Sequence, residues 1–122
     1  MKYCEFCKDH GLEVGMRINI DTTEIILRAC EHLQIRYDLV ISKNRHRRIV
    51  ESRMMIIDLL RHNQDLRLSL QEIGNKFGGK DHTTILHSLK TIRNLCQVDP
   101  IFKYNLLQLY LVVYNSTRYF NH

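Results

Sequence analysis

The chain has 122 residues, of which 44% are hydrophobic and 25% are charged, values that are ordinary for a soluble globular protein. No apolar run is long enough to cross a membrane, and the N-terminus lacks the apolar core of a signal peptide. The sequence therefore predicts one cytoplasmic domain with a short appendage.

Positive charge is concentrated in the second part of the chain. Residues 1–38 contain five Lys/Arg and seven Asp/Glu, whereas residues 39–122 contain thirteen Lys/Arg and six Asp/Glu. The two parts therefore carry formal charges of −2 and +7. This asymmetry indicates that the basic part faces a polyanion.

Residues 1–19 show no clear apolar period and contain two glycines, so we expect a loosely ordered N-terminal segment. Within it, Cys4 and Cys7 form a C-x-x-C pair, and His10 follows at a spacing that suits a structural zinc site. Cys30 or His32 could supply the fourth ligand. Alternatively, the cysteines are free thiols, as is usual in a chain without secretory features.

Helical apolar spacing then recurs in five stretches, in a chain with only one proline and five glycines. The five stretches are residues 21–34, 47–62, 69–77, 81–96 and 100–114. Residues 35–42 read as an extended connector between the first two, and residues 115–122 as a frayed tail. The sequence thus predicts an all-α multi-helix bundle of about five helices over residues 20–114.

Three of the five stretches begin with a recognisable start signal. Asp21 with Glu24, and Ser69 with Glu72, have the spacing of a capping box, in which each residue bonds a backbone amide of the other. Pro100 stands at the first position of the last stretch, where proline is favoured. These signals predict where the helices begin.

A short helix, a glycine turn and a longer helix lie next to each other in the middle of the chain. Gly78 and Gly79 separate the third and fourth stretches and accept the positive φ of a tight reversal. This order is typical of a helix-turn-helix, in which the first turn of the second helix enters the DNA major groove.

The segment K-D-H-T-T, residues 80–84, has the chemistry that a major-groove reader needs. Base edges present donors, acceptors and the thymine methyl group. Lys80 can contact phosphate or guanine, Asp81 can accept from a cytosine amine, and His82 can donate or accept. The methyl group of Thr83 can contact a thymine methyl. The same segment, however, also fits a solvated helix start that Asp81 simply caps.

The segment SLQEIGNKFGGKDHTTILHSLKTI, residues 69–92, resembles the C-terminal DNA-binding domain of DnaA, the bacterial replication initiator. That family has the pattern I-G-x-x-F-G-G followed by R/K-D-H-T/S-T-V/I-L-H. Upstream, SKNRHRRIVESR, residues 42–53, resembles the basic loop and the start of the long helix of the same family. The resemblance covers about residues 20–110 and implies a helix-turn-helix that binds double-stranded DNA.

The resemblance also implies which residues contact DNA. Arg45 falls where the family inserts an arginine into the minor groove, whose negative potential attracts a guanidinium. Asp81, His82 and Thr83 match the base-reading residues in the major groove. Lys80 replaces the usual arginine and keeps its charge without its bidentate geometry. Phosphate contacts are expected for Lys43, Arg47, Arg48, Arg53, Ser69, Gln71, Thr84 and Lys90.

No set of nucleophile, base and orienting group is apparent, and no phosphate-binding glycine loop with its lysine is present. We therefore expect no enzyme, no ATPase, and no cofactor other than the candidate zinc. We expect the chain to bind, as a monomer, a double-stranded site that resembles a DnaA box. This binding is expected to modulate replication initiation or transcription without melting an origin. The alternative hypothesis is a protein-interaction adaptor that keeps the fold and binds a replication protein.

Overall fold

The structure, a computed structural model, describes residues 22–64 and 66–114. These residues form six helices and no strand. The helices are α2 (Thr22–Leu33), α3 (Tyr37–Val40), α4 (Arg47–Arg61), α5 (Leu70–Lys76), α6 (His82–Val98) and α7 (Pro100–Tyr114). The all-α fold that the sequence predicts is confirmed. The predicted N-terminal segment, Asp21 and the tail lie outside the described residues.

The prediction of an extended connector before the long helix is wrong, because α3 lies within it. Val40 donates its amide to the carbonyl of Arg36 at 3.2 Å, and Ile41 donates to that of Tyr37 at 3.2 Å, which closes a single helical turn. One turn is too short to show a 3.6-residue period in a sequence. The carbonyls of Leu39 and Val40, at the end of α3, accept from the side chain of Arg53 on α4. The local sequence does not reveal this partner.

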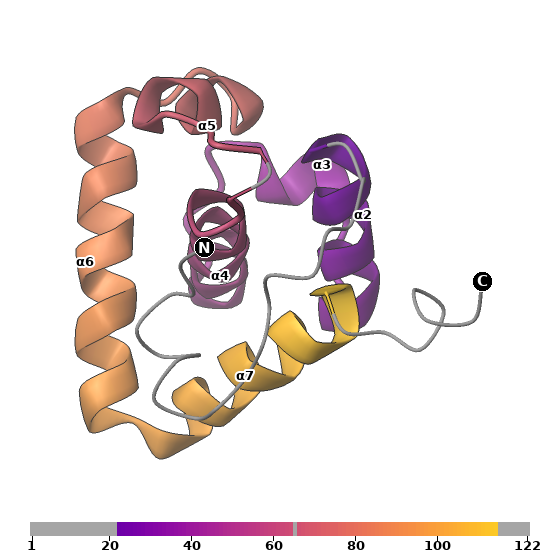
Figure 1. The fold of residues 1–122 in the computed structure, drawn as a ribbon, viewed down its shortest axis with the longest axis vertical. Coiled ribbons are helices and arrows are strands. Elements are labelled where there is room, and N and C mark those ends of the chain that lie inside the picture. The colour runs from indigo at the N-terminus through magenta and orange to yellow at the C-terminus, as the bar shows by residue number, and fades with distance from the viewer. Residues whose placement is uncertain (1–21, 65, 115–122) are drawn as a thin grey trace.

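Helix α4 occupies the middle of the molecule, with α6 on one side and α2 on the other (Figure 1). Helix α7 crosses one end and packs against both α2 and α6, while α5 packs on α6 at the other end. Every residue from 52 to 60 of α4 is buried. Each fully buried leucine or isoleucine contributes about 1.5–3 kcal/mol, so α4 is a firm support for the loops at its ends.

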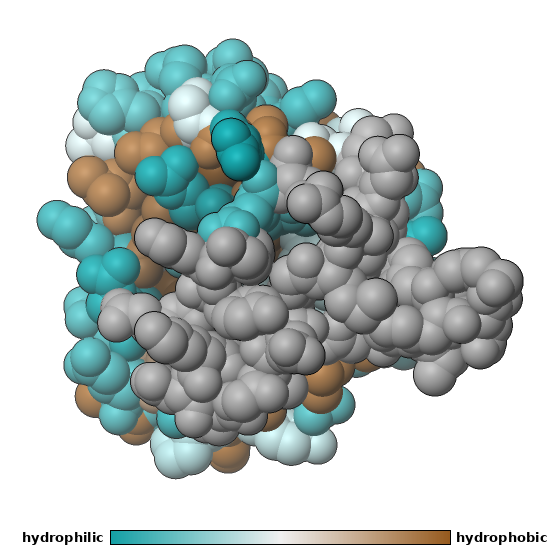
Figure 2. Space-filling view, viewed as in Figure 1, coloured by the Kyte–Doolittle hydropathy of each residue, from teal (hydrophilic) through white to brown (hydrophobic). Residues whose placement is uncertain are grey.

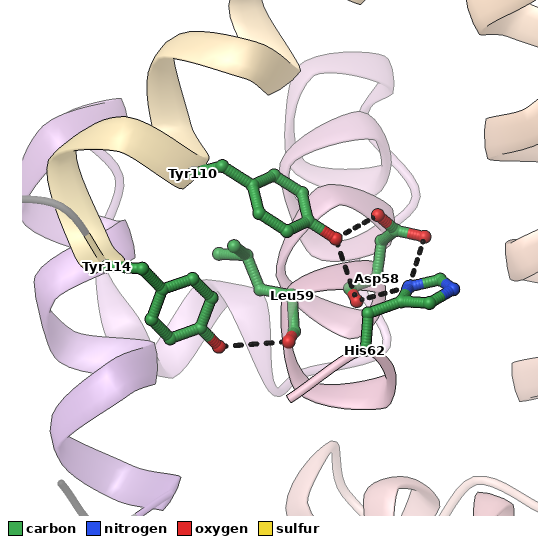
Figure 3. A network of polar contacts seen from close by, with 5 residues as sticks. All are labelled: Asp58, Leu59, His62, Tyr110 and Tyr114. Atoms are coloured by element: carbon green, nitrogen blue, oxygen red, sulfur yellow. Dashed lines mark hydrogen bonds and ion pairs between the residues drawn. The ribbon is translucent and has the colours of Figure 1, made fainter. Parts of the chain in front are cut away.

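A buried polar network joins α4 to α7 (Figure 3). The hydroxyl of Tyr110 donates to Asp58 Oδ2 at 2.5 Å, and His62 Nδ1 lies 3.3 Å from Asp58 Oδ1. The hydroxyl of Tyr114 donates to the carbonyl of Leu59 at 2.9 Å. A buried carboxylate is costly without partners, and here it has a phenol and an imidazole beside it.

Side-chain caps fix the starts of α5 and α6. Ser69 Oγ accepts from the amide of Glu72 at 3.1 Å, and Glu72 Oε1 accepts from the amide of Ser69 at 2.8 Å, which confirms this capping box. Asp81 Oδ1 accepts from the amide of Thr84 at 2.9 Å. The two helices therefore begin at defined residues on either side of the glycine turn.

Candidate nucleic-acid interface

A glycine on α5 lets the turn fold back tightly onto that helix. The carbonyl of Gly74 accepts from the amides of Phe77, Gly79 and Lys80, at 3.1, 3.1 and 3.0 Å. A Cβ on Gly74 would lie 1.9 Å from the carbonyl oxygen of Lys80, so no side chain fits there. Gly78 and Gly79 have φ of 82° and 77°, as the turn prediction requires. The close contact of Gly74 was not predicted, although a glycine inside a helix is a recognised signal of close packing.

The basic loop, residues 42–46, is held in shape by its own polar side chains. Ser42 Oγ donates to the carbonyl of Leu39 at 2.7 Å and accepts from the amide of Asn44 at 3.1 Å. Asn44 Oδ1 accepts from the amide of His46 at 2.8 Å, and His46 Nδ1 accepts from the amide of Arg48 at 3.3 Å. Successive caps of this kind give the loop a defined path into α4.

Arg53, on α4, is buried beneath the basic loop with only 7% of its surface exposed. Its Nε donates to the carbonyl of Val40 at 2.6 Å, and its Nη2 donates to the carbonyls of Asn44 at 3.0 Å and Leu39 at 3.3 Å. Burial lowers the pKa of this guanidinium. The structure thus directs the charge of Arg53 to protein carbonyls, whereas the resemblance implies a phosphate contact for it.

Lys80 links the helix-turn-helix to the basic loop. Its Nζ donates to the carbonyl of Phe77 at 2.8 Å and to that of Ser42 at 3.2 Å, across 38 residues of sequence. Burial lowers the pKa of Lys80, and the positive charges of Arg53 and Lys43 lower it further. The ammonium group expected at phosphate or guanine therefore contacts two backbone carbonyls in this structure.

Between the basic loop and α6 lies a groove of about 820 Å³. The loop and the glycine turn form one part of its wall, and one face of α6 forms another. The lining residues are Lys43, Arg45, Val50, Arg53, Met54, Gly78, Gly79, Lys80, Thr84, His87, Ser88 and Thr91. The structure thus brings together five of the predicted site residues, and it adds His87, Ser88 and Thr91, which were not predicted as site residues.

The tip of α6 projects from this groove. Asp81, His82 and Thr83 are all exposed, next to the groove residue Thr84. The bond from the amide of Thr84 holds the pKa of the Asp81 carboxyl below its usual range. Asp81 thus acts as the helix cap, the alternative to the predicted base contact, and His82 and Thr83 follow it in the first turn of α6.

The remaining predicted arginines have partners within the protein. Arg47 is exposed and lies 3.1 Å from the carboxylate of Glu51, one turn along α4. Arg48 donates through Nη2 to the carbonyls of Leu33 at 2.8 Å and Gln34 at 3.3 Å, and thereby caps the end of α2. Neither residue lines the groove.

Three further predicted phosphate contacts lie apart from the groove. Ser69 is used as the cap of α5, and Gln71 donates to Asn75 Oδ1 at 3.2 Å on the exposed side of that helix. Lys90 is exposed but lines a second hollow on another face of α6. The groove residues Thr84, His87, Ser88 and Thr91 follow the spacing of a single helical face, and Lys90 falls outside it.

The predicted zinc ligands Cys4, Cys7 and His10 lie outside the described residues. Of the two suggested fourth ligands, Cys30 is buried in the core, and burial raises the pKa of its thiol to about 11. Because zinc binds the thiolate, this environment disfavours Cys30 as a ligand. Across the described ranges, no three His, Cys, Asp or Glu side chains are grouped so as to hold a metal.

Residues 22–92 match the protein family described as the bacterial dnaA protein helix-turn-helix. The chain belongs to this family. The matched segment runs from the start of α2 into α6 and includes the basic loop, the glycine turn and the tip of α6. The domain is therefore a DNA-binding helix-turn-helix of the DnaA type, as the resemblance implies.

Relatives of this domain are chromosomal replication initiator proteins DnaA. That of Jannaschia sp. (strain CCS1) is 45% identical over 76 residues, which are 62% of this chain and 16% of that protein. That of Thermomicrobium roseum is 33% identical over 98 residues, 80% of this chain and 21% of that protein. That of Neisseria meningitidis is 32% identical over 103 residues, 84% and 20%. The chain thus spans only about a fifth of the length of each of these relatives, between 16% and 21%. Within the described ranges, no helix has the length and apolar character of a membrane span.

Proposed function

We propose that this DnaA-type domain binds double-stranded DNA in a sequence-specific way, at a site resembling a DnaA box. The observation that carries the proposal is the groove that joins the basic loop to one face of α6. It places exposed cations beside a polar helix tip, so that phosphate attraction and base contact can act on the same duplex.

The tip of α6 reads bases in the major groove. His82 and Thr83 are exposed in the first turn, and neither side chain is used as the helix cap. An imidazole offers a donor and an acceptor to base edges, and a threonine methyl offers an apolar contact to thymine. Asp81 fixes the position of this turn through its bond to the amide of Thr84.

The basic loop supplies the second contact. Arg45 and Lys43 are exposed and line the groove. Arg45 enters the minor groove, where the potential is most negative, and Lys43 contacts phosphate. Arg53 and Lys80 act mainly as positioning residues, because their charged groups bond the carbonyls that give the loop its path.

The biological consequence is occupation of DnaA-box-like sites. The relatives are named chromosomal replication initiator proteins, and a domain that shares their DNA-binding fold can compete for the same sites or act beside them. Binding as a monomer then modulates replication initiation or transcription of the DNA that carries such sites.

The proposal is tested by two single variants measured on a duplex with a DnaA box and on a scrambled duplex. His82→Ala is expected to lose about 1–3 kcal/mol of discrimination between the two duplexes, with nearly unchanged binding to the scrambled one. Lys43→Ala is expected to weaken binding to both duplexes alike and to reduce the slope of log K against log salt by about 0.9. If the two variants behave identically, the division into base readers and phosphate contacts is wrong.

A further inference from the structure

A second hollow, of about 300 Å³, lies away from the groove, among α4, α5, α6 and α7. It is formed by the end of α4, the start of α5 and a face of α6 that does not line the groove. The lining residues are Asp58, Arg61, His62, Leu70, Leu86, Leu89, Lys90, Ile92, Arg93, Cys96 and Leu106. None of them lines the groove described above.

Cations surround the mouth of this hollow. Arg61, Lys90 and Arg93 are exposed, and Arg61 is held in place by a bond from Nη1 to the carbonyl of Leu68 at 3.0 Å. Among the described ion pairs, none involves these three side chains. Within the described residues, the rim therefore carries positive charge that no ion pair balances.

The inner part of the hollow, unlike its cationic rim, is mostly apolar and contains one carboxylate. The carboxylate of Asp58 is the acidic group here, and it is turned to the hydroxyl of Tyr110 and the imidazole of His62 (Figure 3). Leucines form the walls beside it, and Leu86 keeps 42% of its surface exposed. On the face shown in Figure 2, hydrophobic and hydrophilic side chains lie side by side over α5 and α6.

We propose that this hollow binds a short acidic segment of a partner protein through one large apolar side chain. The apolar side chain enters between the leucines of α5 and α6, and flanking carboxylates pair with Arg61, Lys90 and Arg93. A volume of about 300 Å³ is at the lower limit of ligand pockets and suits one or two side chains. The arrangement of an apolar centre within a charged rim is that of protein interfaces.

A second DNA duplex fits this surface less well. Phosphates that entered the hollow would meet leucines and the carboxylate of Asp58, whereas a peptide can leave its carboxylates at the rim. Because the groove lies on another face of α6, DNA that is bound in the groove alone leaves this hollow accessible. The inference thus adds a partner site to the proposed DNA-binding function and does not depend on it.

The test is a selection of random peptides displayed on phage, against the immobilised full chain with and without a saturating DnaA-box duplex. We expect enrichment of peptides that combine Asp or Glu with Leu, Phe or Trp, equally in both arms. One enriched peptide, synthesised with a fluorophore, should then bind the chain in solution. Arg93→Glu and Leu86→Glu should each lower its affinity at least about tenfold.

The matched control is Lys76→Glu, which makes the same change of charge at an exposed position of α5 outside the hollow. It should change the affinity for the peptide less than about twofold. Thermal unfolding of each variant verifies that it folds, which is expected because Arg93 and Leu86 are exposed. Enrichment of no acidic peptides, displacement of the peptides by the duplex, or equal binding to all three variants would overturn the proposal.

Discussion

Single residues determine the shape of the groove and of the loop beside it. Gly74 and Gly79 illustrate two different reasons for a glycine. At Gly74 a Cβ would collide with the carbonyl of Lys80, although its φ is not in the left-handed region. At Gly79 a Cβ would meet nothing within 4 Å, but φ is 77°. A side chain is disfavoured at Gly74 because there is no space for it, and at Gly79 because of the positive φ.

This difference predicts the order of two substitutions. Gly74→Ala must move the backbone of the turn, so it should destabilise the domain by about 2–3 kcal/mol, as overpacking does. Gly79→Ala adds only the strain of positive φ, about 1–2 kcal/mol. Urea unfolding followed by circular dichroism measures both. If Gly79→Ala costs as much as Gly74→Ala, the contact with the Lys80 carbonyl does not limit the turn.

Arg53 is expected to contribute to folding far more than an exposed arginine does. Arg53→Met removes the donor to the carbonyls of Val40 and Asn44, while the carbonyl of Leu39 keeps its bond from Ser42 Oγ, and each buried unpaired acceptor costs about 1–3 kcal/mol. A loss of at least about 2 kcal/mol in the free energy of unfolding is therefore expected. Arg47→Met is the matched control, because Arg47 is exposed and its pair with Glu51 is worth at most about 1 kcal/mol. Equal losses in the two variants would show that Arg53 does not hold the basic loop.

At the scale of the elements, the caps of α5 and α6 make the domain sensitive to acid. Bonds to the backbone hold the pKa of Glu72 below its ordinary value of 4.5 and that of Asp81 below 3.8. A carboxyl whose pKa falls on folding stabilises the protein above its unfolded pKa, and this stability is lost as the pH drops through the folded pKa. The caps therefore contribute at neutral pH and stop contributing in acid.

The double variant Glu72→Gln, Asp81→Asn keeps hydrogen-bonding side chains but removes both charges. Its melting temperature should be lower than that of the wild type at about pH 7, and this difference should shrink as the pH falls to about 3. Thermal unfolding across this range measures the effect. A difference that stays constant with pH would mean that the ionised caps are not the source of the acid sensitivity.

The elements that the sequence predicts well are those with local signals. The capping box of Ser69 and Glu72 and the glycine turn involve residues within a few positions, and the structure has them where the sequence predicts. The cap at Asp81 is equally local, and it was the alternative to the predicted base contact. Helix α3 lacked such a signal, because a single turn shows no period and its end is stabilised from α4.

The orientation of the site residues could be predicted only in part. The exposed tip of α6 follows from the pattern of the helix-turn-helix. In contrast, the bond of Lys80 to Ser42 spans 38 residues, and the bond of Arg53 to Asn44 joins α4 to the loop before it. Charge and spacing cannot show that these two cations face carbonyls, or that Lys90 lines a different hollow from His87, because both outcomes depend on how the helices pack.

At the scale of the whole molecule, α6 serves two surfaces at once. One face lines the groove together with the basic loop, and another lines the hollow with its cationic rim. The buried middle helix α4 supports both, since it begins at the basic loop and ends at the hollow. The proposed DNA site and the proposed partner site thus lie on different faces of the same helix.

The central claim is sequence-specific DNA binding by this DnaA-type domain, and one titration tests it most directly. Fluorescence anisotropy at near-physiological salt compares a duplex that carries a DnaA box with a scrambled duplex of equal composition. We predict at least about a thousandfold preference for the box, as specific DNA-binding proteins show. Equal, weak and strongly salt-dependent binding to both duplexes would contradict the claim, because it would leave only the attraction of the basic surface for phosphate.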